Sequence, residues 1–235
     1  MNWTMTYRRD ADVWNQYGHM VKLKNPAKIN FEEIWSVKTK TAAWLASNCY
    51  TANGRTELVD ELVKADLPID RWGACGRPVR GCDRSRLYDH CVVDLIKPYK
   101  FYMSFENTNC KDYVTEKFYL TMKDRLAVPV VIKRSIYEDL GIPGHSFIAL
   151  DDFENVNKMA AFIMKVASNK TAYLEYHKWR TDYGVIDNDF DSYFCGLCRK
   201  LRRGISKHKS YENLYTWHAD GMCDNKYTFK FFSKQ

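Results

Sequence analysis

The stretch Tyr99–Arg125 reads YKFYMSFENTNCKDYVTEKFYLTMKDR, and its pattern changes part-way from that of a strand to that of a helix. The first residues are aromatic-rich and alternate, which is typical of a β-strand. After a polar loop, Val114, Phe118 and Met122 recur every fourth residue and predict a helix. We expect that helix to open at Asp112 or the next residue, with Asp112 as its N-cap. The stretch therefore predicts a strand, a loop and a helix of an α/β protein.

The same alternation of strand and helix patterns extends along much of the chain. Further strands are predicted over residues 41–47, 68–72, 128–132 and 146–150, and helices over 58–63, 87–96 and 159–166. In the first of these helices, Leu58, Val59, Leu62 and Val63 are expected on one buried face. Such alternation predicts a doubly wound parallel sheet that binds its ligand beyond the carboxyl ends of the strands.

The chain is expected to hold one main domain. We place this α/β domain at residues 41–180, after a leading segment of residues 1–40 and before a basic, Cys-containing tail of residues 181–235. No linker rich in Pro, Gly or Ser divides it further, and no repeat is visible.

The opening of the predicted helix after Tyr99–Phe105 has the residue types of a nucleotide site. Backbone N–H groups there can bind a phosphate, and Lys117 adds a positive charge. Glu116 can accept hydrogen bonds from ribose hydroxyls, while Tyr102 or Tyr113 can stack on a base. From these residues alone, a capped helix with a solvated Glu–Lys pair remains the alternative.

Arg55 is the second candidate. It closes the loop after the strand predicted at residues 41–47, so it should lie on the same rim of the sheet. A guanidinium suits bidentate phosphate binding. An ordinary loop arginine is the alternative when the residue is taken alone.

Charge and cysteine content point to an anionic partner and an oxidising compartment. The formal net charge is +7, which favours nucleic acid, a membrane surface or a phosphorylated small molecule. Eight Cys and two N-glycosylation sequons, at Asn2 and Asn169, favour a secretory protein. No apolar run approaches the ~18 residues of a membrane span.

The hexapeptide DYVTEK, within FYMSFENTNCKDYVTEKFY, resembles the hallmark of the α1,3-fucosyltransferase family. Other blocks follow in the order of that family over nearly the whole chain. They are MNWTMTYRRDADVWNQYG at residues 1–18, Ser47-Asn48-Cys49 with Arg55, WGACG at 72–76, VPVV at 128–131, SFI with DF at 146–153, the segment 176–180 and the C-x-x-C of Cys195 and Cys198.

This resemblance implies the fold and the chemistry. The family has two facing Rossmann-like domains, an arrangement known as GT-B, and the chain resembles the C-terminal, donor-binding half. The implied reaction is an inverting transfer of L-fucose from GDP-fucose, α1,3 to N-acetylglucosamine of a glycan. Carried over by motif, Arg55 and Lys117 would bind the diphosphate and stabilise the charge of the leaving group. The implied nucleotide-site residues are Ser47, Arg55, Tyr102, Asn107, Tyr113, Glu116 and Lys117.

The resemblance also has gaps. Residues 132–134 (IKR) stand where the family usually has Gly after VPVV, and residues 142–145 (IPGH) replace a Pro-rich turn, so the resemblance does not extend to the contacts with fucose. No general base is assigned, because it is expected in the missing acceptor domain that precedes Met1 and out of which residues 1–40 would lead. No metal site is assigned, and the resemblance gives no ligand set for Mn²⁺. We expect a lumenal domain at the Golgi membrane whose anchor lies outside this chain, acting on glycoprotein or glycolipid glycans and not on nucleic acid.

Two other functions remain open at this point. One is a catalytically inactive nucleotide-sugar-binding domain, or a truncated gene product. The other is a zinc-stabilised nucleic-acid binder, suggested by the basic run 199–209. Its zinc ligands would come from Cys195, Cys198, His208, His218 and Cys223.

Overall fold

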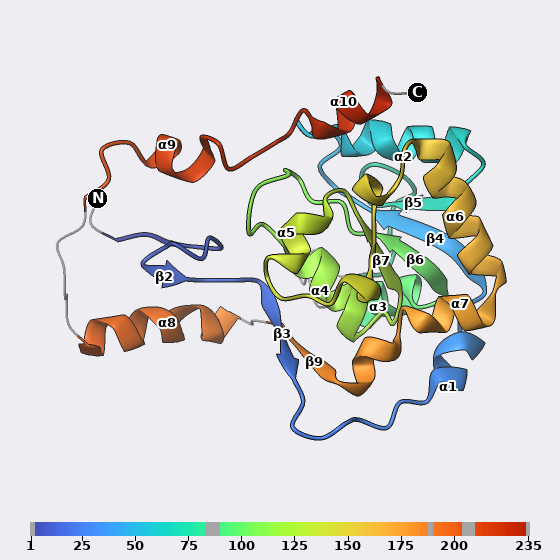
Figure 1. Ribbon diagram of the computed structural model, residues 1–235, viewed down its shortest axis with the longest axis horizontal. Helices are drawn as coiled ribbons and strands as arrows, with labels where there is room; N and C mark the ends of the chain where they lie inside the picture. The colour runs from blue at the N-terminus through green and yellow to red at the C-terminus, as the bar shows by residue number, and fades with distance from the viewer. Residues whose placement is uncertain (1–2, 83–89, 188–189, 204–209, 234–235) are drawn as a thin grey trace.

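A five-stranded parallel sheet forms the centre of the molecule (Figure 1). The computed structural model describes residues 3–82, 90–187, 190–203 and 210–233. The strands of the central sheet are β4 (Lys40–Leu45), β5 (Ile69–Trp72), β6 (Tyr99–Met103), β7 (Val128–Val131) and β8 (Ile148–Ala149), in the spatial order β5-β4-β6-β7-β8. All four neighbouring pairs are parallel. The predicted Rossmann-like α/β fold is confirmed.

The strand order places a switch point between β4 and β6. The chain passes from β4 outward to β5 on one side, then returns to build β6, β7 and β8 on the other side. Ala42 in β4 therefore pairs with Ile69 of β5 and with Phe101 of β6. Loops that leave β4 and β6 diverge at their carboxyl ends, and ligands of doubly wound sheets bind in the crevice that results.

Helices cover both faces of this sheet because alternate strand residues are apolar on each side. One face packs Trp44 and Phe101 against Leu62 of α2 (Arg55–Lys64) and Ile163 of α6 (Val156–Ser168). The opposite face carries α3 (His90–Ile96) and α4 (Glu116–Lys123). Shorter helices are α1 (Phe31–Ser36), α5 (Arg134–Glu138), α7 (Lys170–Glu175), α9 (Leu214–Ala219), α10 (Tyr227–Phe232) and the 3₁₀ turns η1 (Gly144–Ser146), η2 (Leu150–Asp152) and η3 (Lys178–Thr181).

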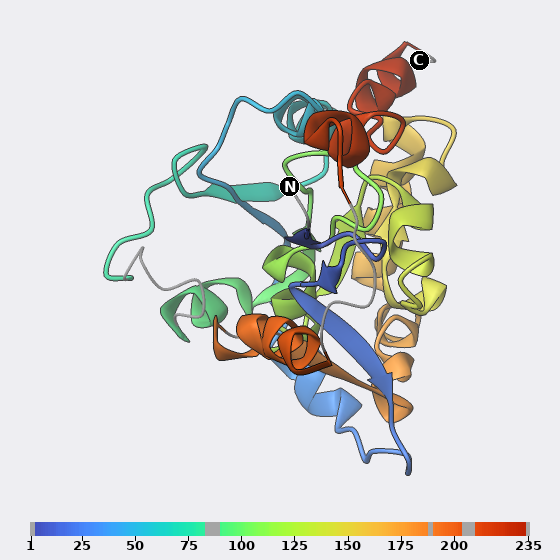
Figure 2. The same cartoon turned by 90° about the vertical axis from the view of Figure 1, so that its left-hand side faces the viewer.

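The N-terminal and C-terminal segments lie together beside the sheet. Strand β3 (Gly18–Lys22) pairs antiparallel with β9 (Tyr183–Asp187), and short β1 (Met5–Thr6) pairs with β2 (Val13–Trp14). Figure 2 shows the N-terminal strands β1 and β2 between α8 (Phe190–Arg203) and α9. The guanidinium of Arg8 stacks 4.3 Å above the ring of Trp217, which joins the two ends of the chain. The proposed division at residues 40 and 180 stays a prediction.

The structure corrects three local predictions. Asp112 is not an N-cap: its φ is 64°, and α4 begins at Glu116 with Thr115 as the N-cap. Val63 is 41 % exposed, so it does not share the buried face of α2. The strand predicted over residues 146–150 is reduced to two residues between 3₁₀ turns. Residues 87–89 of the helix predicted over 87–96 lie outside the described residues. No helix within the described ranges has the length and apolar character needed to cross a bilayer.

Neighbouring residues of α2 test this packing directly. Leu62 is fully buried, whereas Val63 is 41 % exposed. Leu62→Ala should lower the free energy of unfolding by about 2–5 kcal/mol, because it removes buried methyl groups and leaves a cavity. Val63→Ala should change it by less than about 0.5 kcal/mol. Urea denaturation measures both, and equal losses would contradict the assigned face.

Candidate functional site

A cavity of about 750 Å³ opens at the carboxyl ends of β4 and β6, and we call it the switch-point cavity. Its charged and polar walls are Ser47, Asn48, Arg55, Tyr102, Asn107, Glu116, Lys117 and Arg125. Gly73 forms part of its rim with a φ of +87°, and a Cβ there would lie 2.5 Å from the carbonyl oxygen of Ala46. Only glycine fits this left-handed, close approach. The volume falls within the ~300–1,000 Å³ of typical ligand pockets.

Arg55 begins α2 and sits in the wall of this cavity, 1 % exposed. Its two Nη atoms donate to the backbone carbonyls of Phe105, at 2.9 Å, and Asn48, at 2.7 Å. These bonds fix the guanidinium between the loops that follow β4 and β6. Burial lowers the pKa of Arg55, although the carboxylate of Glu106 opposes that effect. Its buried Nε finds no partner among the described residues. The guanidinium is thus a fixed positive charge in the cavity wall.

Lys117 is held by a buried carboxylate that the sequence analysis did not single out. Glu106 follows β6 and accepts hydrogen bonds from the backbone N–H of Thr115 at 2.8 Å and from its hydroxyl. The ammonium of Lys117 lies 3.4 Å from the Glu106 carboxylate and 3.2 Å from that of Glu116. This contact network places Lys117 in the cavity wall at the opening of α4.

The electrostatics keep Lys117 protonated. Burial alone would lower its pKa, but the carboxylates of Glu106 and Glu116 outweigh burial and raise it. For the carboxyl group of Glu106, burial has the opposite effect and raises the pKa, and the positive charge of Lys117 opposes that rise. A fixed positive charge beside the first turn of a helix is a suitable partner for a phosphate group.

Arg125 adds a third cation that sequence reasoning missed. It is buried, lines the switch-point cavity and lies 4.7 Å above the ring of Tyr102. Its Nη1 donates to Thr121, while its buried Nε has no partner among the described residues. The side chain follows α4 and no motif marks it, so only the three-dimensional packing brings it to Tyr102.

The predicted site residues divide between two cavities. Ser47, Arg55, Tyr102, Asn107, Glu116 and Lys117 all line the switch-point cavity. Tyr113 instead lines a neighbouring cavity of about 680 Å³, which we call the Tyr113 cavity, and its ring packs 4.7 Å from that of Tyr7. Because α4 begins three residues later than predicted, Tyr113 belongs to the preceding loop. The functional roles of all these residues stay predictions.

Disulfides reinforce both cavities. Cys49–Cys75 ties the loops that follow β4 and β5, and Cys110–Cys223 ties the loop before α4 to the C-terminal segment. A third disulfide joins Cys82 and Cys91. The predicted disulfide character of the protein is confirmed by these three bonds, whereas Cys195 and Cys198 lie exposed on α8.

The structure removes Cys223 from the residues considered as zinc ligands, because it forms a disulfide with Cys110. His218 Nε2 lies 3.3 Å from the hydroxyl of Tyr7. His208 lies outside the described residues. In residues 3–82, 90–187, 190–203 and 210–233, no group of three or more His, Cys, Asp or Glu side chains could hold a metal ion.

Comparison with known proteins identifies the relationship. Residues 35–217 match the family model described as glycosyltransferase family 10 (fucosyltransferase), C-terminal. The chain belongs to glycosyltransferase family 10. It is 46 % identical to alpha-(1,3)-fucosyltransferase fut-6 of Caenorhabditis elegans and 44 % identical to fut-5 of the same organism, with 98 % of the chain covered in each case. It spans 60 % and 62 % of the lengths of these two relatives.

Solved structures support the fold. A crystal structure of an α1,3-fucosyltransferase with GDP-fucose matches 74 % of this chain and 51 % of its own length, with a TM-score of 0.54 and 22 % identity. The same enzyme class solved with GDP gives a TM-score of 0.55 at 22 % identity. The resemblance covers about half of each solved chain, which agrees with the predicted Rossmann-like half of a GT-B fold.

The buried carboxylate of Glu106 yields a stability prediction. Glu106→Gln replaces an acceptor facing Thr115 by an amide and leaves the ammonium of Lys117 with less compensation. The free energy of unfolding should fall by about 1–3 kcal/mol. Glu154→Gln is the matched control, because Glu154 is exposed and should contribute less than about 0.5 kcal/mol. Denaturant titration measures the free energy of unfolding of both variants. Equal values for the two would contradict a structural role of Glu106.

Proposed function

We propose that this chain is the donor-binding part of an α1,3-fucosyltransferase and binds GDP-fucose in the switch-point cavity. The observation that carries the proposal is the convergence of Arg55, Lys117 and Arg125 on a cavity at the switch point of the sheet. Among the described residues of its wall, Glu116 is the one carboxylate beside three cations, a net positive charge that suits a diphosphate. Membership of family 10 supports fucose as the sugar.

The positions of the cations suggest how they would act. When an acceptor hydroxyl attacks the anomeric carbon of fucose, the bond from that carbon to the diphosphate oxygen breaks and GDP leaves. Negative charge then grows on the diphosphate. Lys117 and the guanidinium of Arg55 are fixed before the reaction begins, so their positive charges would stabilise the diphosphate without reorganising. Inversion follows from attack on the side opposite the leaving group. No residue of this chain is assigned as general base.

The acceptor and the compartment complete the proposal. The acceptor is a glycan carrying N-acetylglucosamine, fucosylated through an α1,3 linkage on a glycoprotein or glycolipid. The compartment is the Golgi lumen, at its membrane. Three disulfides within the described residues support an oxidising environment. The exposed Asn169, in its sequon, supports passage through the secretory route.

The inactive nucleotide-sugar-binding alternative is not favoured. Both relatives that match 98 % of the chain are named fucosyltransferases. The residues that would bind a diphosphate are also present and gathered on one cavity. A nucleic-acid function has no comparable support, since the positive charges of the site line a pocket sized for a small molecule.

Binding of GDP and GDP-fucose tests the proposal. Arg55→Gln and Lys117→Gln keep a hydrogen-bond donor but remove the charge, so each should weaken binding of both ligands by about tenfold or more. Lys64→Gln is the matched control, because Lys64 is exposed at the far end of α2 and should leave affinity unchanged. Isothermal titration calorimetry gives the affinities. A folded wild-type chain that binds neither ligand at millimolar concentration would refute the proposal.

Glu116 is expected to bind the ribose. Its carboxylate lies on the cavity wall and 3.2 Å from Lys117, close to where the diphosphate would be. Wild-type protein should bind 2′,3′-dideoxy-GDP about tenfold more weakly than GDP, because charge-assisted hydrogen bonds are lost. Glu116→Ala, which has no acceptor at this position, should bind the two ligands almost equally. If the preference for GDP persists undiminished in the variant, Glu116 does not contact the ribose.

A further inference from the structure

The Tyr113 cavity lies beside the switch-point cavity, across a single loop. Consecutive residues of that loop face different cavities, since Asn107 lines the switch-point cavity and Thr108 lines the Tyr113 cavity. At the opening of α4, Tyr113 likewise lines the Tyr113 cavity, whereas Glu116 lines the switch-point cavity. A ligand in the Tyr113 cavity would therefore lie next to a donor bound in the switch-point cavity.

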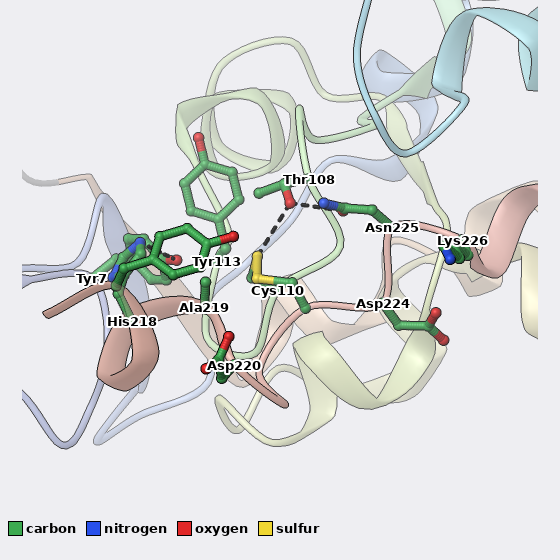
Figure 3. A pocket seen from close by; sticks show the side chains of 12 residues that line it. Tyr7, Thr108, Cys110, Tyr113, His218, Ala219, Asp220, Asp224, Asn225 and Lys226 are labelled. Carbon is green, nitrogen blue, oxygen red and sulfur yellow. Dashed lines mark hydrogen bonds between the residues drawn. A yellow bond between two sulfur atoms is a disulfide. The ribbon is translucent and has the colours of Figure 1, made fainter. Parts of the chain in front are cut away.

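The walls of the Tyr113 cavity combine aromatic faces with acidic side chains (Figure 3). Tyr7 and Tyr113 pack with ring centroids 4.7 Å apart, and the ring of His218 lies 5.4 Å from that of Tyr7. Tyr215 is 72 % exposed on the same cavity. Aromatic rings carry negative charge on their faces, which attracts the C–H groups on one face of a sugar ring.

The charged groups of this cavity differ from those of the switch-point cavity. Its described lining holds two carboxylates, Asp220 and Asp224, and the ammonium of Lys226, and Asp224 also pairs with Lys133 at 3.5 Å and Lys230 at 3.8 Å. Among the described residues it lacks the three clustered cations of the switch-point cavity, so it is less suited to a nucleotide diphosphate. Carboxylates are acceptors for sugar hydroxyls, and an ammonium is a donor to them. The combination favours a neutral, hydroxyl-rich ligand.

The cavity is also formed before any ligand arrives, because the C-terminal segment is fastened to the loop before α4. Lys111 N–H donates to Met222 O at 2.8 Å, and Asp224 N–H donates to Asn109 O at 2.9 Å, on either side of the disulfide. The side-chain oxygen of Asn225 accepts from the hydroxyl of Thr108 and from the backbone of Asn109. Preorganised walls reduce the entropy lost on binding.

We propose that the Tyr113 cavity binds neutral sugar residues of the acceptor glycan, through stacking on Tyr215 and Tyr113 and hydrogen bonds to Asp220. The role of that sugar as acceptor rests on the proposed function, whereas the binding of a neutral oligosaccharide does not. The cavity volume of about 680 Å³ is larger than one sugar ring needs and suits a short oligosaccharide.

The test uses the 235-residue chain, with N-acetyllactosamine and the trisaccharide of N-acetylglucosamine as probes. Saturation-transfer NMR detects binding of each probe, and titration gives its affinity. Tyr215→Ala and Asp220→Asn should each weaken binding of at least one probe by about fivefold. GDP affinity, measured in the same samples, should stay unchanged. Tyr50→Ala is the matched control, because Tyr50 is 96 % exposed and lines neither cavity, and it should leave oligosaccharide binding unaltered. Thermal melting confirms that each variant is folded.

The outcomes separate this inference from the proposed function. A wild-type chain that binds GDP but neither oligosaccharide overturns the inference and leaves the donor site intact. Oligosaccharide binding that survives both substitutions, or that GDP displaces, also overturns it, because the sugar then occupies another site. Oligosaccharide binding that Tyr215→Ala weakens, in a chain that does not bind GDP, supports the sugar site and refutes the proposed function instead.

Discussion

Helix α4 begins where it does because of one buried carboxylate. Glu106 receives the N–H and the hydroxyl of Thr115, and the ammonium of Lys117 lies beside it. A buried carboxylate is costly unless such partners surround it, so these contacts define the loop between β6 and α4. The backbone carbonyl of Glu106 also accepts from the buried side chain of Asn53, which precedes α2. Both sides of the switch point are thus tied to one residue.

That loop separates two cavities of opposite character. The switch-point cavity collects cations, whereas the Tyr113 cavity collects aromatic rings and two aspartates. The separation depends on the C-terminal segment, which Cys110–Cys223 holds against the loop. Without that segment, the aromatic face of Tyr113 would lack the wall that contains Asp220 and Tyr215. The disulfide joins positions 113 residues apart, so it fixes a contact that local sequence preferences do not specify.

The sequence predicted what depends on local periodicity and motif. The apolar run of β4, the alternation in β6 and the apolar periodicity of α6 were sufficient to predict these elements of the sheet and its helices. Arg55, Glu116 and Lys117 were found because a family motif marks them. Asp112 shows where local reasoning fails: its carboxylate bonds Arg9, 103 residues away, so this tertiary contact outweighs its preference for an N-cap. Glu106 and Arg125 were missed because the contacts that define them, with Thr115 and Tyr102 respectively, form only when the chain folds.

Unsatisfied donors connect stability with the site. Six buried side-chain polar atoms among the described residues have no hydrogen-bond partner, and two of them, the Nε atoms of Arg55 and Arg125, belong to residues of the switch-point cavity. Each buried unpaired donor costs about 1–3 kcal/mol. Folded proteins satisfy nearly all such groups, so both guanidinium groups are held in this wall at a cost in stability. In the proposed donor complex their positive charges would face the diphosphate, which connects that cost to the proposed function.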